Sequence, residues 1–244
     1  MRVAKTADDV ASGVWVVDLS REHLGPAAVN AILSPDEIAR ADRFLRPADR
    51  RRFLGSHLAV RLVLGRALGI DPADLDFAAG PNGKPELKPR GRDRLDFNLS
   101  HSGDFALIGV SRQGAIGVDV EVARPIADTL RVARAHFAPS EIQTLEGCTS
   151  EALPGAFFAC WTCKEAFVKA TGAGLSMRLD RFAVTIPPAP ARVVSIDGDA
   201  TAGRTWSLHR LAPAPGHVGA VAIAAPDTAC EVLHLEPGWA RARW

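Results

Sequence analysis

The chain has 244 residues, of which 47% are hydrophobic and 23% charged, so it can bury the core of one large or two small domains. Its 29 lysines and arginines against 28 acidic residues leave a net charge of +1, which excludes a uniformly basic nucleic-acid-binding protein and an acidic disordered chain. No apolar run approaches the roughly 20 residues that span a bilayer. Asp8 and Asp9 precede the short apolar stretch 14–17, which is unlike a secretion signal, and four cysteines are too few for a disulfide framework. We therefore expect a soluble, cytoplasmic enzyme that neither enters a membrane nor binds nucleic acid.

Helix signals are clear in the first half of the chain. Ser34, Pro35 and Glu37 have the pattern of a helix start, with an N-cap, a proline at the first position and a glutamate at the third. Apolar residues at helical spacing predict a longer helix over about 51–68, ended by Gly69. The other elements predicted here are a strand at 14–17, a tight turn at 82–83, and strands over 95–99, 105–111 and 115–122.

A similar order recurs in the second half. A helix is predicted over about 155–171, followed by strands over 181–186, 192–196, 206–211 and 218–224. We therefore predict an α+β fold of two similar α+β lobes related by a pseudo-twofold axis, with the active site in the cleft between them. The predicted division is an N-terminal lobe of residues 1–112 and a C-terminal lobe of residues 113–244.

Two carboxylates in the strand over 115–122 suggest a metal site. Asp119 and Glu121 lie two residues apart, so their side chains share one face of the strand. Mg²⁺ prefers one or two carboxylates together with waters and phosphate oxygens. An exposed edge-strand face would give the same spacing, and both interpretations stay open on spacing alone.

The helix over 155–171 carries a second charged pair, Glu165 and Lys169, four residues apart and so on one helix face. A surface ion pair of this kind is common, but the surrounding residues are strongly apolar, which indicates a mostly buried helix. Only five of the 29 basic residues are lysines, and three of them, Lys84, Lys164 and Lys169, lie within motifs. Lysine and arginine are not interchangeable at phosphate or proton-transfer sites.

Polar side chains also cluster at 97–103, where a predicted strand runs into a turn that contains Asn98, Ser100 and His101. A serine hydrolase is disfavoured, because adjacent strand residues face opposite ways and there is no Gly-x-Ser-x-Gly elbow. A group of hydrogen-bond donors for a phosphate fits the segment better.

Two further features have competing interpretations. Residues 40–52 hold six arginines against two aspartates, a local charge of +4, which suits a polyphosphate, an acidic protein surface or simply a solvated helix face. Cys160 and Cys163 form a single Cys-x-x-Cys pair in an apolar segment, where inert core cysteines are the favoured interpretation over a zinc or redox site.

Four of these segments, in this order, resemble the 4′-phosphopantetheinyl transferase superfamily, in its long, two-lobed, surfactin-synthetase-activating type. They are Asn-Gly-Lys-Pro at 82–85, Phe-Asn-Leu-Ser-His-Ser at 97–102, Gly-Val-Asp-Val-Glu at 117–121 and Trp-Thr-Cys-Lys-Glu-Ala-Phe-Val-Lys at 161–169. The four blocks cover 24 residues. The resemblance implies a transferase that moves 4′-phosphopantetheine from coenzyme A to a serine of an apo acyl- or peptidyl-carrier protein and releases 3′,5′-ADP. It also implies dependence on Mg²⁺, a monomeric chain, and a role in polyketide, nonribosomal peptide or fatty-acid biosynthesis.

The resemblance also implies roles for particular residues. Asp119, Glu121 and Glu165 would hold Mg²⁺, Glu165 or a metal-bound water would be the general base, and Lys169 would contact the phosphate. The residues that match the coenzyme-binding positions are Arg40, Lys84, Asn98, Ser100, His101, Asp119, Glu165 and Lys169. The role of Arg52 stays open, as does the identity of the carrier protein. The alternatives are a nucleic-acid-binding module built on the arginine cluster and a Cys-x-x-Cys thiol-redox protein.

Overall fold

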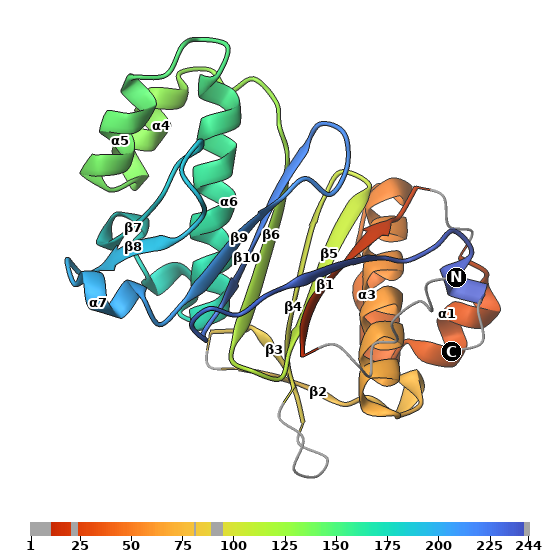
Figure 1. The fold of residues 1–244 in the computed structure, drawn as a ribbon. Coiled ribbons are helices and arrows are strands. Elements are labelled where there is room, and N and C mark those ends of the chain that lie inside the picture. The colour runs from red at the N-terminus through yellow and green to blue at the C-terminus, as the bar shows by residue number, and fades with distance from the viewer. Residues whose placement is uncertain (1–10, 21–23, 81, 89–94, 242–244) are drawn as a thin grey trace, which may run out of the picture.

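The computed structural model describes residues 11–20, 24–80, 82–88 and 95–241 (Figure 1). In these residues the strands form two main sheets and two small antiparallel pairs. The first sheet has the order β11-β1-β5-β4, and its strands are β1 (Ser12–Asp18), β4 (Asp96–Ser102), β5 (Phe105–Ser111) and β11 (Glu231–His234). The second has the order β6-β10-β9, with β6 (Ile116–Val122), β9 (Ser207–Leu211) and β10 (His217–Ile223). The small pairs join β2 (Phe77–Ala79) to β3 (Pro85–Leu87) and β7 (Phe182–Val184) to β8 (Val193–Ile196).

Two long helices cover the outer faces of these sheets. Helix α3 (Pro47–Leu68) packs on the first sheet and α6 (Leu153–Thr171) on the second, which gives four layers in the order α3, first sheet, second sheet, α6 (Figure 1). Shorter helices surround them: α1 (Pro26–Ile32), α2 (Pro35–Ala41), α4 (Thr129–His136), α5 (Pro139–Glu146) and α7 (Ala200–Gly203). The predicted α+β class with two lobes is confirmed. No helix in the described part of the chain combines the length and the apolar character needed to cross a membrane.

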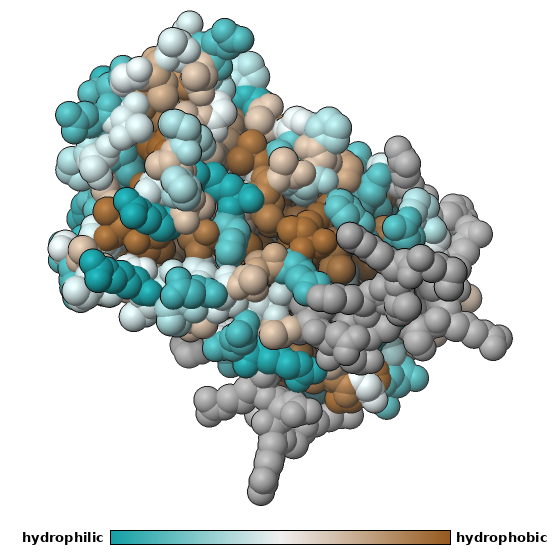
Figure 2. Space-filling model, in the orientation of Figure 1, coloured by the Kyte–Doolittle hydropathy of each residue, from teal (hydrophilic) through white to brown (hydrophobic). Residues whose placement is uncertain are grey.

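Strand alternation explains the layers. In β1, Trp15 and Val17 belong to the cluster under α3, whereas Val14 and Val16 belong to a separate cluster with Val118 of the second sheet. The two sheets therefore face each other through an apolar layer of their own. In the orientation of Figure 1, apolar side chains also reach the surface over the central strands, bordered by polar ones (Figure 2).

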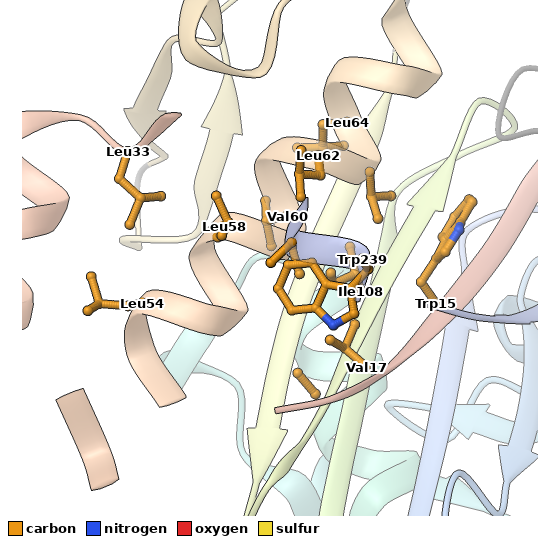
Figure 3. Close-up of a cluster of buried hydrophobic side chains, with 14 of the residues drawn as sticks. Trp15, Val17, Leu33, Leu54, Leu58, Val60, Leu62, Leu64, Ile108 and Trp239 are labelled. Atoms are coloured by element: carbon orange, nitrogen blue, oxygen red, sulfur yellow. The ribbon is translucent and has the colours of Figure 1, made fainter. Parts of the chain in front are cut away.

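The C-terminal segment belongs structurally to the first lobe. Strand β11 pairs in parallel with β1, with Leu233 opposite Trp15. Trp239 is buried in the first lobe's core, beside Val17 and Ile108 (Figure 3). The division of the chain at 112/113 stays a prediction. The structure adds that the chain returns to the first lobe after residue 230.

Helices α2 and α3 are joined through Glu37. The predicted capping box is present: the Ser34 amide donates to Glu37 Oε2 at 2.9 Å, and the Glu37 amide donates to Ser34 Oγ at 3.3 Å. The same carboxylate contacts His57 Nδ1 at 3.0 Å and accepts from the buried Arg61 Nε at 2.8 Å. Burial raises the pKa of Glu37, but the contacts with His57, Ser34 and Arg61 outweigh it and lower the pKa to about 2.

Polar side chains of β4 join the two sheets, in a set of hydrogen bonds that we call the β4–β6 ladder. Alternate residues of β4 face β6, and each accepts a hydrogen bond from a main-chain N–H of β6. The donor–acceptor pairs are Ile116 N to Asp96 Oδ2 (2.7 Å), Val118 N to Asn98 Oδ1 (2.9 Å), Val120 N to Ser100 Oγ (3.4 Å) and Val122 N to Ser102 Oγ (3.2 Å). The edge of β6 that faces away from β10 is thus satisfied by side chains instead of by another strand.

Helix α6 lies unusually close to β6 at Gly117. A Cβ placed on Gly117 would lie 2.1 Å from the Ala166 carbonyl oxygen and 2.3 Å from the Ala170 nitrogen. Ala166 and Ala170 are themselves buried and small. Glycine is therefore required at 117 for helix and strand backbones to touch.

We expect Gly117→Ala to displace α6 from β6. The clash is with backbone atoms, which have no rotamer to relieve it, so the free energy of unfolding falls by about 1–3 kcal/mol or more. Gly155→Ala in α6 is the control, since a Cβ at Gly155 would meet nothing within 4 Å. That control keeps or slightly raises stability, because alanine is the better helix former. Urea unfolding of both variants measures this, and equal stability of the two would contradict the close packing.

Candidate active site

The contact of α6 with β6 places Lys169 against Asp119. Lys169 Nζ donates to Asp119 Oδ1 at 2.6 Å and to Ser100 Oγ at 3.0 Å, and Ser100 Oγ also donates to Asp119 Oδ1 at 3.0 Å. Asp119 is buried, whereas the Lys169 side chain is 30% exposed, so this ion pair reaches solvent through the lysine. Helix α6, β6 and β4 thus each supply one group to the same point.

The second Asp119 oxygen is the least satisfied polar atom of the cluster. Asp119 Oδ2 is buried and accepts no hydrogen bond from the described residues. The pKa of Asp119 is raised overall, because burial raises it by more than the ammonium of Lys169 lowers it. A buried carboxylate oxygen without a donor is costly, so a ligand or cation at Oδ2 would relieve it.

Glu121 and Glu165 add negative charge beside Asp119. Glu121 Oε2 accepts a hydrogen bond from Ser102 Oγ at 2.9 Å. The pKa of Glu165 is raised by partial burial and by the neighbouring carboxylates of Asp119 and Glu121, with Lys169 acting in the opposite direction. The three predicted metal ligands are therefore close enough to repel one another.

The chemistry of these carboxylates suits a hard cation such as Mg²⁺. Among the described residues, no three His, Cys, Asp or Glu side chains are already gathered as a metal site. Mg²⁺ needs only one or two carboxylates and completes its shell with waters and phosphate oxygens. Such a cation would contact Asp119 Oδ2, to which no described residue donates. It would also offset the repulsion between the three carboxylates. Mg²⁺ ligation by Asp119, Glu121 and Glu165 stays a prediction.

The predicted coenzyme contacts on β4 occupy different environments. Asn98 and Ser100 are buried, and both take part in the β4–β6 ladder. His101 alternates to the other side and is exposed at the strand end. Partial desolvation lowers the pKa of His101, and so do the nearby charges of Lys169, His57 and Arg52. Nearby positive charge of this kind favours an anion, and of these three residues His101 is the exposed one. Contact of Asn98, Ser100 and His101 with the coenzyme stays a prediction.

Lys84 is held by protein groups. Its Nζ donates to Asp96 Oδ2 at 2.9 Å and to the Ile116 carbonyl at 3.0 Å, and its side chain is 13% exposed. The neighbouring Asn82 Nδ2 donates to the Gly172 carbonyl at the end of α6, at 2.7 Å. This predicted turn therefore connects the first lobe to β6 and α6, and the contact of Lys84 with the coenzyme stays a prediction.

Arg40 lies on an aromatic stack at the end of α2. Its guanidinium is 5.3 Å from the centroid of the Phe53 ring, which stacks on His57 with centroids 4.0 Å apart. Arg52 Nε donates to Asp104 in the β4–β5 turn at 2.9 Å. The charges of His57 and Arg52 both lower the pKa of His101. The contact of Arg40 with a coenzyme phosphate stays a prediction.

Gly117 and Ser102 stand in the motif blocks at 117–121 and 97–102, but the motifs predicted no role for either. The polar residues at alternate positions over 96–102 were a signal for Ser102. Lys164, flagged with its motif, is fully buried: its Nζ donates to Glu141 Oε1 at 2.7 Å and to the Phe182 carbonyl at 2.7 Å. It anchors α6 to α5 and β7 instead of facing a substrate.

Two further observations bear on the predicted alternatives. Cys160 and Cys163 are buried, and burial raises the pKa of both thiols, that of Cys163 to about 11. That is the reverse of a reactive thiolate and argues against a redox protein. A hollow of about 560 Å³ is lined by residues of α5 and of the β7–β8 region, and none of the predicted site residues lines it. An active-site cleft between the lobes therefore stays a prediction.

The chain matches two family models, one for each lobe. Residues 23–113 match the model described as 4′-phosphopantetheinyl transferase, N-terminal, and residues 115–224 match the 4′-phosphopantetheinyl transferase superfamily. The two matches meet at the turn 112–114, which β5 precedes and β6 follows. The second match contains Asp119, Glu121, Glu165 and Lys169.

Curated relatives agree with the family models. The chain is 37% identical to the 4′-phosphopantetheinyl transferase HetI of Nostoc sp. over 213 residues, which is 86% of this chain and 86% of HetI. It is 33% identical to the 4′-phosphopantetheinyl transferase Sfp of Bacillus subtilis over 158 residues, 64% of this chain and 67% of Sfp. Together with the site geometry, these matches show that the chain belongs to the 4′-phosphopantetheinyl transferase superfamily.

Proposed function

We propose that this transferase moves the 4′-phosphopantetheine group of coenzyme A onto a serine of an apo acyl- or peptidyl-carrier protein, with 3′,5′-ADP as the second product. The observation that carries the proposal is the cluster of Asp119, Lys169 and Glu165. Its buried Asp119 keeps one oxygen to which no described residue donates, beside a lysine that reaches solvent. An arrangement of this kind suits a pyrophosphate with a cation.

In the proposed reaction the carrier's serine oxygen forms a bond to the phosphorus that bears pantetheine. The bond from that phosphorus to the bridging oxygen breaks, and the electron pair leaves with 3′,5′-ADP. Glu165 accepts the serine proton, and its raised pKa makes it a stronger base than an ordinary carboxylate. Lys169 donates to phosphate oxygens and stabilises the charge that develops on them. Mg²⁺, held by Asp119, Glu121 and Glu165, would supply additional positive charge to the pyrophosphate.

The nucleotide end of coenzyme A is proposed to meet the cationic region around His101. His101 is exposed there, Arg52 adds positive charge, and we propose that the exposed Arg40 reaches the same phosphates. Asn98 and Ser100 contribute through the β4–β6 ladder, which holds β4 in position against β6. We further propose that the chain acts as a monomer in the cytoplasm, on carriers of polyketide, nonribosomal peptide or fatty-acid synthesis.

The activity is tested by mass spectrometry of candidate apo carrier proteins. Incubation with coenzyme A, Mg²⁺ and this protein is expected to add one phosphopantetheine per carrier. A carrier whose acceptor serine is replaced by alanine is the control and gains nothing. Absence of the adduct across acyl- and peptidyl-carrier proteins, with Mg²⁺ present, would contradict the proposed activity.

Glu165→Gln separates proton transfer from metal binding. Glutamine keeps the size of the side chain and one ligand oxygen but cannot accept the serine proton. We expect kcat to fall by roughly 10²–10⁴-fold, with little change in KM for coenzyme A, when turnover is measured across a Mg²⁺ titration. Glu151→Gln, an exposed glutamate before the same helix, is the matched control and keeps wild-type turnover. Full recovery of Glu165→Gln at high Mg²⁺ would remove the base role and leave Glu165 as a metal ligand.

His101→Ala and Lys84→Ala are expected to differ. Loss of His101 raises KM for coenzyme A by about tenfold or more, as expected when a charge-assisted contact worth about 1.5–3 kcal/mol is lost, and leaves Tm unchanged. Lys84→Ala lowers Tm as well, because it breaks the contacts to Asp96 and Ile116. Lys88→Ala, at an exposed lysine 4.0 Å from Asp76, is the control. Equal rises of KM for coenzyme A and for the carrier would exclude His101 from the coenzyme site.

A further inference from the structure

The turn between α2 and α3, residues 42–46, exposes an apolar side chain that folding does not explain. Leu45 is 99% exposed, and the adjacent Phe44 is 40% exposed. Phe44 anchors the turn by packing on Phe53, with ring centroids 5.4 Å apart, which leaves Leu45 projecting into solvent. Of the four large hydrophobic residues exposed in the described part of the chain, these two are the only neighbours in sequence. We call this segment the Leu45 turn.

Positive charge surrounds Leu45. Arg43 and Arg46 flank it, both are exposed, and neither forms an ion pair with a described residue. Arg50, one turn into α3, is by contrast paired with Asp42 at 2.9 Å. Residues 40–52 carry a charge of +4 in a chain whose total is only +1. The arginines do not serve the stability of α3 either, because positive charge is disfavoured at a helix N-terminus.

The Leu45 turn adjoins the proposed coenzyme site. Phe53, on which Phe44 packs, also carries the guanidinium of Arg40 and stacks on His57. The next residue back, Arg52, is tied to the β4–β5 turn through Asp104. A macromolecule bound at Leu45 would therefore lie beside the region where the nucleotide phosphates are proposed to bind.

From this geometry we infer that the Leu45 turn is the docking surface for the apo carrier protein, by insertion of Leu45 into an apolar depression that is bordered by carboxylates on the carrier. The inference rests on the proposed function, because that reaction requires a protein partner whose serine reaches the coenzyme. Charge complementarity selects the acidic class of carrier surface, with Arg43 and Arg46 pairing around the apolar contact.

The test compares two variants with matched controls. Leu45→Ser removes the apolar contact, and Arg43→Glu with Arg46→Glu reverses the charge. Val232→Ser replaces another exposed apolar residue, and Arg192→Glu with Arg204→Glu reverses two exposed arginines of the other lobe. We expect KM for the carrier to rise about tenfold in Leu45→Ser and in the charge-reversed variant, with KM for coenzyme A and Tm unchanged. The controls keep wild-type KM for both substrates.

Direct binding supplies a second measurement. The affinity of a labelled carrier with its acceptor serine replaced by alanine should fall by the same factor in both Leu45-turn variants. At 0.5 M salt the charge-reversed variant and the wild type should converge, while Leu45→Ser stays weaker, because screening removes only the electrostatic part.

The outcomes separate the two proposals. Transfer by the wild-type chain with unchanged carrier affinity in both variants would overturn the docking surface and leave the proposed function standing. Absence of transfer to any carrier would overturn both. Wild-type binding to phosphatidylglycerol vesicles that is lost in Leu45→Ser, with carrier KM unchanged, would reassign the turn to an anionic membrane and overturn the inference.

Discussion

The β4–β6 ladder is the interaction on which the arrangement of this molecule depends. Strand β6 pairs with β10 on one edge, and its other edge would leave main-chain N–H groups unsatisfied between the two lobes. Side chains of β4 accept these hydrogen bonds at every second residue. Because each bond joins one residue of β4 to one of β6, the ladder fixes the register of the lobes to a single residue. This register places the Ser100 hydroxyl within hydrogen-bond distance of Asp119, and the Ser102 hydroxyl within hydrogen-bond distance of Glu121.

The site then forms where the ladder meets the closest helix–strand contact. Gly117 allows α6 to touch β6, and Glu165 and Lys169, one helical turn apart, flank that contact. Both constraints act on β6, the ladder along its edge and α6 over Gly117. A serine from the first lobe and a lysine from the second therefore meet on one Asp119 oxygen, and the other oxygen accepts no hydrogen bond from the described residues.

Local patterns in the sequence predicted the elements that build this site, because each depends on residues close in sequence. The strand predicted at 105–111 is confirmed with the same bounds. The helices predicted at 51–68 and 155–171 are also present and begin slightly earlier, at Pro47 and Leu153. Strand β11 could not be predicted, since its four residues are held by a parallel partner more than 200 positions away. Asn98 faces the ladder, whereas His101 faces outward and is exposed. The sequence alone could not predict this difference, because it depends on β6, a strand of the other lobe.

The three lysines that the motifs singled out show what a motif leaves undecided. Each is paired with a carboxylate, yet the pairs differ in burial. Lys164 and Glu141 are both sealed in the core, and such a pair is costly to break but cannot bind a substrate. Lys84 and Asp96 are mostly covered, and the Asp96 oxygen that Lys84 contacts also accepts from the Ile116 amide. The pair of Lys169 and Asp119 combines a lysine that reaches solvent with a carboxylate oxygen still lacking a donor. Of the three pairs this one is the most open to substrate charge, because the other two lysines are already held by buried or mostly covered partners.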